Sequence, residues 1–162
     1  MGGAIGLGNW TPAAEFNMWS DPEAAHTVLN SGATITMVPL EVTHQALATP
    51  EVMARFESIG TPVARMAAEL MRYFAGTYER VFGFAAPAVH DPCALARVIE
   101  PETVRTRRMH VAVETSSELC DGRTLCDVHG VTGNPPNVEV GTDLDAERYW
   151  DLVVAALASY PA

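Results

Sequence analysis

The chain has 162 residues, a length typical of one domain, and residues 1–162 are expected to form a single folded unit. Hydrophobic residues make up 48% and charged residues 19%, with a mean hydropathy of +0.08, which excludes an intrinsically disordered chain. The net charge of −10, from 20 acidic and 10 basic residues, argues against a protein that binds the phosphate backbone of nucleic acid. No run of about 18 apolar residues occurs, so no membrane-spanning helix is expected. Residues 1–8 lack the basic and long apolar segments of a signal peptide, so a cytoplasmic protein is expected.

The three cysteines do not form the pattern of a disulfide framework. They are Cys93, Cys120 and Cys126. Asp121-Gly122 is typical of a two-residue hairpin turn, and that register would pair Cys126 with Ser117 rather than with Cys120. Free thiols in a reducing compartment are therefore expected.

Local signals divide the first part of the chain into a loop, a helix and a strand. Residues 1–8 are glycine-rich and are predicted to be the end of a strand that runs into a loop. Asp21-Pro22-Glu23 combines an N-cap, a proline in the first turn and an acidic residue near the positive end of the helix dipole. That helix is predicted to end near Asn30, before Ser31-Gly32. The apolar stretch Thr34–Val38 predicts a short buried strand.

Two further helices begin with the same combination of a capping residue and proline. Thr49-Pro50 and Thr61-Pro62 mark their starts, and Gly60 separates them. The second helix is predicted over about 62–80, and a loop rich in glycine, alanine and proline follows over 82–89. Apolar residues at helical spacing predict a buried face on this helix: Val63, Met66, Ala67, Leu70, Met71 and Phe74.

The last part of the chain again alternates helix and strand signals. Pro92–Ile99 is predicted as a helix, and Val104–Glu114 and Arg123–Val131 as the two strands of a hairpin. Val138–Val140 is a short candidate strand, and Asp145–Ser159 an amphipathic helix. The alternation indicates an α/β fold with a parallel sheet and an added β-hairpin. Because only one central strand is convincing, the strands that flank it are expected to lie outside this chain.

A polar cluster follows the glycine-rich start of the chain. Gly8–Asn17 brings Asn9, Glu15 and Asn17 into a short segment. Amide and carboxylate groups close together can hold a polyol, since each sugar hydroxyl both donates and accepts a hydrogen bond. The alternative is a loop in which these side chains cap turns and helix ends.

A second candidate site is His90-Asp91-Pro92. In a functional interpretation, Asp91 would ligate a hard cation and His90 would donate a proton beside it. In the alternative interpretation, Asp91 is an N-cap and His90 an ordinary packed or surface side chain.

Several blocks, in order and spacing, resemble the C-terminal half of the nucleoside hydrolase family. These are MGGA, GN, TP, AEFN and DPEAA near the start, then ITMVPLEVT, VHDPCALA and DVHGVTGNPPNVEV. The family, which includes inosine-uridine preferring members, is calcium-dependent and cleaves the N-glycosidic bond of ribonucleosides to give ribose and a free base. The resemblance covers nearly the whole chain, and it implies a truncated domain with part of a Rossmann-like parallel sheet.

The resemblance implies roles for the polar cluster. Asn9, Glu15 and Asn17 match residues that hold the ribose hydroxyls, and Met1 matches a methionine at the sugar. The implied reaction passes through an oxocarbenium-like state, as in glycoside hydrolysis. Hydrogen bonds to the sugar hydroxyls can strengthen in that state.

The resemblance also implies roles for the second candidate site and for one helix. Asp91 matches a ligand of the Ca²⁺ ion, and His90 matches a histidine that protonates the leaving base. Phe74 and Tyr78 match aromatic residues that approach the base.

The chain lacks the aspartate cluster, of the form DTDPGxDD, that supplies most of the calcium ligands and the general base in the family. Three interpretations remain open. The chain is one part of a nucleoside hydrolase whose missing N-terminal half must be supplied, or a self-associating, catalytically inactive relative that binds a ribonucleoside or ribose. The third interpretation is a structural or interaction protein without a ligand. Because strand edges would be exposed, a homo-oligomer or a complex with the missing half is expected.

Overall fold

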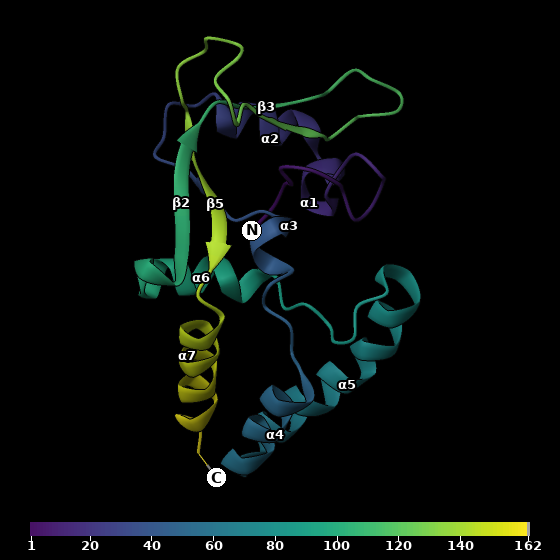
Figure 1. Ribbon diagram of the computed structural model, residues 1–162, viewed down its shortest axis with the longest axis vertical. Helices are drawn as coiled ribbons and strands as arrows, with labels where there is room; N and C mark the ends of the chain where they lie inside the picture. The colour runs from purple at the N-terminus through teal and green to yellow at the C-terminus, as the bar shows by residue number, and fades with distance from the viewer. Residues whose placement is uncertain (162) are drawn as a thin grey trace.

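The computed structural model describes residues 1–161 and shows a mixed α/β fold built on two small sheets (Figure 1). The larger sheet has the strand order β1-β5-β2, with β1 at Thr36–Met37, β5 at Val138–Leu144 and β2 at Val104–Met109. The smaller sheet pairs β3 (Val111–Val113) with β4 (Thr124–Cys126). Strands β1 and β5 are parallel, whereas β2 and β5, and β3 and β4, are antiparallel. The predicted α/β class with an added hairpin is therefore confirmed.

Strand β5 is the centre of the larger sheet. Its register places Glu139 opposite Thr36 of β1 and Val140 opposite Arg107 of β2. The sequence predicted that both neighbours of the strand at 34–38, which is β1, lie outside the chain. This is wrong for one neighbour, because β5 pairs with β1 within the chain. The predicted strand at 138–140 proved longer because Val138, Val140 and Leu144 are all buried, and this burial continues to the end of β5.

The predicted hairpin is correct only in its inner part. Strand β2 pairs with β5, so only β3 and β4 pair with each other, with Val111 opposite Cys126. The predicted two-residue turn and its cysteine register are wrong, because Glu114 ends the strand early. Its carboxylate accepts hydrogen bonds from the backbone N–H groups of Ser116 and Ser117, which starts a longer loop. All three cysteines are free, as expected.

Seven α-helices and a short 3₁₀ helix surround the sheets in residues 1–161. They are α1 (Phe16–Ser20), α2 (Pro22–Leu29), α3 (Leu40–Thr43), α4 (Pro50–Ile59), α5 (Pro62–Phe82), α6 (Asp91–Ile99), the 3₁₀ helix Pro101–Thr103 and α7 (Ala146–Ala158). Three predicted starts are confirmed, since the side chains of Asp21, Thr49 and Thr61 each accept an N–H group from the first turn. The short helices α1 and α3 were not predicted. None of these helices has the length and apolar content needed to cross a membrane.

Two clusters of buried side chains form the core. One lies between the larger sheet and helices α3, α4, α6 and α7, and includes Val42, Phe56 and Trp150. The other lies between the sheets and α2, and includes Leu29 and Met109. The candidate site described below lies beside these clusters rather than inside them.

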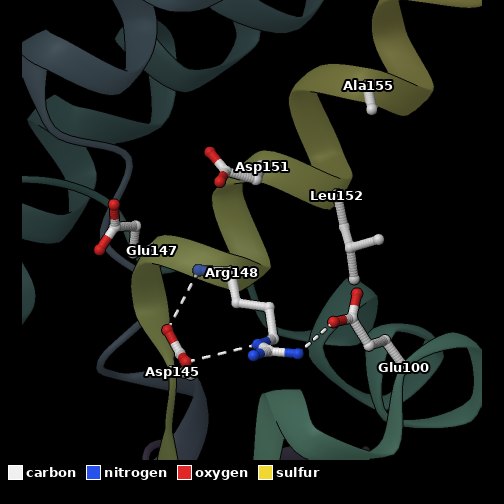
Figure 2. Close-up of a pocket in the computed structure, with 7 residues that line it drawn as sticks. All are labelled: Glu100, Asp145, Glu147, Arg148, Asp151, Leu152 and Ala155. Atoms are coloured by element: carbon white, nitrogen blue, oxygen red, sulfur yellow. Dashed lines mark hydrogen bonds and ion pairs between the residues drawn. The ribbon is translucent and has the colours of Figure 1, made fainter.

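An ion cluster fixes the start of α7 against the end of α6. Figure 2 shows Arg148 between carboxylates, with its guanidinium bonded to Glu100 and Asp145. Glu102 Oε2 lies 3.0 Å from the same guanidinium. Most of the charges that line the hollow beside this cluster already have partners, and solvent-exposed ion pairs of this kind contribute little to stability.

The predicted buried face of α5 is only partly buried, since Val63, Ala67 and Met71 are half-buried and the last two pack against the core. Met66, Leu70 and Phe74 are 56%, 47% and 47% exposed, and the buried residues of this helix are instead Ala64, Ala68 and Tyr78. Figure 1 shows α4 beside the first part of α5, whereas the C-terminal end of α5 lies well away from α7. The helical spacing is therefore correct, but the face is covered only along the edge that carries Ala67 and Met71.

Candidate ligand-binding site

A cavity of about 740 Å³ lies between the N-terminal loop, the second half of α5 and the start of α6. Every candidate residue from the sequence lines it: Met1, Asn9, Glu15, Asn17, Phe74, Tyr78, His90 and Asp91. These residues come from three segments that are far apart in the chain. A cavity of this size is typical of small-molecule sites.

Asn9, Glu15 and Asn17 form one side of the cavity, called the polar wall below, and Glu15 is its buried member. It is only 2% exposed, and its two carboxylate oxygens accept hydrogen bonds from the backbone N–H groups of Gly3 (2.9 Å) and Asn17 (3.0 Å). The bond to Asn17 makes Glu15 the N-cap of α1. A buried carboxylate needs such donors, because a charge without partners is costly to bury. Glu15 therefore ties the first residues of the chain to the start of α1.

The two asparagines of the polar wall differ in their bonding. Asn9 Oδ1 accepts the N–H of Phe16 at 2.9 Å, while Asn17 Nδ2 lies 3.4 Å from the carbonyl oxygen and 3.5 Å from the sulfur of Met1. Gly8 makes the loop between them possible, since a Cβ at this position would lie 2.2 Å from Ala14 O. The alternative interpretation, that these side chains cap local structure, is thus true of Asn9 and Glu15, but both also line the cavity.

His90 is held by hydroxyl groups on both sides of its ring. Nδ1 lies 2.7 Å from Thr43 Oγ1, and Nε2 is hydrogen-bonded to the hydroxyl of Tyr78. Thr43 Oγ1 is also 3.5 Å from the carbonyl oxygen of Leu40. These bonds are all satisfied if the proton is on Nδ1 and Tyr78 donates to Nε2. Thr43 was not identified from the sequence, because only the fold brings it to His90.

Burial keeps both members of the Tyr78–His90 pair neutral. Burial and, to a lesser extent, the neighbouring His44 lower the pKa of His90 to about 4, while Asp91 acts in the opposite direction. Burial also raises the pKa of Tyr78. At neutral pH the pair is therefore a neutral hydrogen-bonding group rather than a positively charged acid.

Aromatic rings line the cavity on two sides. On one side, the rings of Tyr78 and Phe82 lie 5.2 Å apart, and Phe74 stands half-exposed near the rim. On the other side, the rings of Trp10 and Phe16 pack edge to face at 5.2 Å. Trp10 and Phe16 were missed in the sequence, although they directly neighbour Asn9 and Glu15. A planar ligand group can stack against such rings.

Asp91 is exposed and is the first residue of α6, and His90 occupies the N-cap position without a capping hydrogen bond from its side chain. The alternative interpretation of Asp91 as the N-cap is therefore wrong. No group of three or more metal-binding side chains occurs in the part of the chain that the structure describes. Ca²⁺ takes 6–8 oxygen ligands. Asp91 could provide one of them, so the described residues alone do not fit a calcium ion.

A family model described as inosine-uridine preferring nucleoside hydrolase matches residues 1–151. The chain belongs to this family. It is 41% identical over 160 residues to the pyrimidine-specific ribonucleoside hydrolase RihB of Escherichia coli O17:K52:H18, with 99% of this chain and 51% of RihB covered. The family resemblance found in the sequence is thus confirmed.

Solved structures support the same relationship. A purine-preferring ribonucleoside hydrolase from Gardnerella vaginalis matches with a TM-score of 0.84 and 28% identity over 98% of this chain and 51% of its own. A plant nucleoside hydrolase, PpNRh1, matches with a TM-score of 0.85 and 27% identity over 98% of this chain and 52% of its own. The chain therefore spans about half the length of the relatives that it matches.

Proposed function

We propose that this chain forms the ribose-binding and base-binding part of a ribonucleoside hydrolase site. The observation that carries the proposal is the convergence of three distant segments, with all eight candidate residues, on one cavity. The family relationship supports the reaction class, which is cleavage of the bond between ribose and base.

The polar wall is suited to the ribose. Glu15 is held in place by two backbone N–H groups, and carboxylate oxygens can accept further hydrogen bonds from sugar hydroxyls. Asn9 and Asn17 add amide donors on the same wall. Because these groups are positioned before a ligand arrives, little conformational entropy is lost on binding.

The aromatic wall is suited to the base. Phe74 offers a ring for stacking. The Tyr78–His90 pair is neutral, and its donor to the departing nitrogen is the Tyr78 hydroxyl once that proton turns away from His90 Nε2. In the hydrolysis, the oxygen of water bonds to the anomeric carbon, the carbon–nitrogen bond breaks, and the base takes up a proton. We propose that the Tyr78–His90 pair hydrogen-bonds to the departing nitrogen and assists this transfer of a proton to the base.

The proposal assigns no residue of this chain to the activation of water. Glu15 is already bonded to the backbone, and Asp91 stands alone at the start of α6. A chain that supplies only this part of the site would bind a ribonucleoside but release no ribose. A ribonucleoside-binding protein without catalysis is therefore the second candidate function, and the same lone Asp91 favours it.

The test is binding and hydrolysis of uridine and inosine by the purified chain, with and without Ca²⁺. Uridine is the first ligand, because the RihB relatives are named for pyrimidine ribonucleosides. We expect a ligand-induced rise in melting temperature that Glu15→Gln abolishes and that the control Glu118→Gln, in the exposed β3–β4 loop, preserves. A folded wild-type chain with no shift for either nucleoside would refute the proposed site. Release of ribose would show that the chain is an enzyme without a further subunit.

A further inference from the structure

We propose that Thr43 is a positioning residue that fixes the tautomer of His90 and, through it, the direction in which the Tyr78 hydroxyl donates. The proposal rests on the proposed function, since it describes how the same site is arranged before a ligand arrives. Thr43 lies in α3 and does not line the cavity, so it acts on a ligand only through His90.

The backbone, rather than the side chains, brings Thr43 and His90 together. Thr43 is the last residue of α3 and His90 directly precedes α6, so they come from elements that are far apart in the chain. The N–H of Val89, next to His90, donates to Ala46 O at 3.0 Å, which joins the two segments. Thr43 is 0% exposed, so water does not reach its hydroxyl. Replacing that hydroxyl by a methyl group should therefore leave the position of the histidine ring unchanged.

Placing the ring proton of His90 on Nδ1 satisfies every donor of this group. Nδ1–H donates to Thr43 Oγ1 at 2.7 Å, and the Thr43 hydroxyl donates to Leu40 O at 3.5 Å. The Tyr78 hydroxyl then donates to His90 Nε2, which carries only a lone pair in this tautomer. Each of the three protons is used in a hydrogen bond, and no donor is left without an acceptor.

The other tautomer leaves one donor unused. With the proton on Nε2, the Thr43 hydroxyl donates to Nδ1, and Nε2–H donates to the Tyr78 oxygen. The hydroxyl proton of Tyr78 then has no acceptor within residues 1–161. The two hydroxyls differ here, because Thr43 has Leu40 O as a second partner for its proton and Tyr78 has none. Since a buried donor without an acceptor is costly, the empty site favours the Nδ1–H tautomer.

His44 is a further polar neighbour of the ring, and it does not select a tautomer. Its ring packs against that of His90 edge to face, with 5.7 Å between the centroids. Its Nε2 atom is buried and has no hydrogen-bond partner within residues 1–161, so it offers His90 neither a donor nor an acceptor. The choice of tautomer therefore lies with the hydroxyls of Thr43 and Tyr78, since the bond made by one ring nitrogen sets the protonation of the other.

The tautomer determines what Tyr78 offers to a ligand. With the proton on Nδ1, the Tyr78 proton is held by His90, and the Tyr78 oxygen presents a lone pair to the cavity. A ligand nitrogen obtains the proton only if its own hydrogen bond replaces the one to Nε2. Without the Thr43 hydroxyl, Nδ1–H would face an apolar side chain, so the proton would move to Nε2. The Tyr78 hydroxyl would then point into the cavity even when the site is empty.

The experiment measures the tautomer directly, by nuclear magnetic resonance of the ligand-free chain with isotopically labelled histidine. A protonated and a bare ring nitrogen differ widely in chemical shift, and at neutral pH the lowered pKa of His90 leaves its ring neutral. The signals that His90→Gln removes belong to His90. We expect a protonated Nδ1 in the wild type and, in Thr43→Val, an exchange of the two nitrogen shifts, with the proton on Nε2. Thr43→Ser keeps the hydroxyl and should restore the wild-type pattern.

The matched control is Thr103→Val. Thr103 is also 0% exposed, and its hydroxyl also donates to a carbonyl three residues earlier, Glu100 O at 2.9 Å, but it does not bond to a histidine. This substitution should leave the His90 shifts unchanged. A wild type with the proton on Nε2, or a folded Thr43→Val with the proton still on Nδ1, would overturn the proposal.

Tyr78→Phe provides a second measurement if Thr43→Val does not fold. The proton should stay on Nδ1 in this variant, because Thr43 still accepts it, and a proton on Nε2 would overturn the proposal. No ligand is present in any of these measurements. A chain that fails to bind uridine would therefore refute the proposed function without changing this result, and a wrong tautomer in a chain that binds uridine would refute only the role of Thr43.

Discussion

The two walls of the cavity are built in different ways. In the polar wall, the carboxylate of Glu15 is buried and bonded to two backbone N–H groups, so the wall is fixed by the chain itself. In the aromatic wall, Tyr78 is buried and bonded to His90, but Phe74, on the same helix α5, is half-exposed. A polar group can be buried only if the chain itself supplies its hydrogen-bond partners, whereas an aromatic ring can stay exposed until a ligand or another surface covers it.

Removing the carboxylate of Glu15 should have the largest effect on stability, because it removes the hydrogen bonds that hold the polar wall together. Glu15→Ala leaves the buried N–H of Gly3 and the partly buried N–H of Asn17 without acceptors, which should lower the free energy of unfolding by about 2–4 kcal/mol. Urea denaturation measures the change. The exposed Glu118→Ala is the control and should leave the midpoint unchanged. An equally small effect of both substitutions would show that the bonds of Glu15 do not hold this wall.

The histidine of the aromatic wall should make stability depend on pH. His90 titrates near 6.5 when unfolded and its pKa is lowered to about 4 in the fold, so the unfolded chain binds more protons between these values. Stability is therefore complete above about pH 6.5 and falls as the pH decreases toward 4. Between pH 7.5 and pH 5 we expect a loss of about 1–2 kcal/mol from this group.

The measurement compares urea midpoints of the wild type and His90→Gln at these two pH values. Other groups contribute to the wild-type slope, and burial also lowers the pKa of His44. The difference between the two proteins isolates His90. Identical pH dependence in both would mean that His90 is not buried in its neutral form.

The polar wall could be anticipated from the sequence more completely than the sheet. The segment Gly8–Asn17 carries its own turn and cap signals, and His90-Asp91 was a candidate by residue type before the family resemblance gave it a role. Thr43 could not be found in this way, because its bond to His90 crosses 47 residues. Local patterns identify the residue types of a site, but only the fold shows which of them meet.

The same distinction explains the errors in the fold. The starts of α4 and α5 were correct because threonine and proline act within one turn. The pairing of β2 was wrong because its partner, β5, lies far along the chain, and a hairpin with the nearer β4 was equally compatible with the local pattern. Strand pairing is decided by burial across the sheet, which a strand's own sequence does not contain.

Phe74→Ala should have the smallest effect on stability, and it separates the role of the aromatic wall in ligand binding from that of the polar wall. Because the ring is 47% exposed and on the open face of α5, its removal should change the free energy of unfolding by about 0.5 kcal/mol or less. If the ring stacks on the base, the substitution should weaken binding of uridine but not of free ribose, which contacts only the polar wall. Calorimetric titration with both ligands measures this difference. Equal weakening of uridine and ribose would place the sugar, rather than the base, against α5 and would reverse the roles proposed for the two walls.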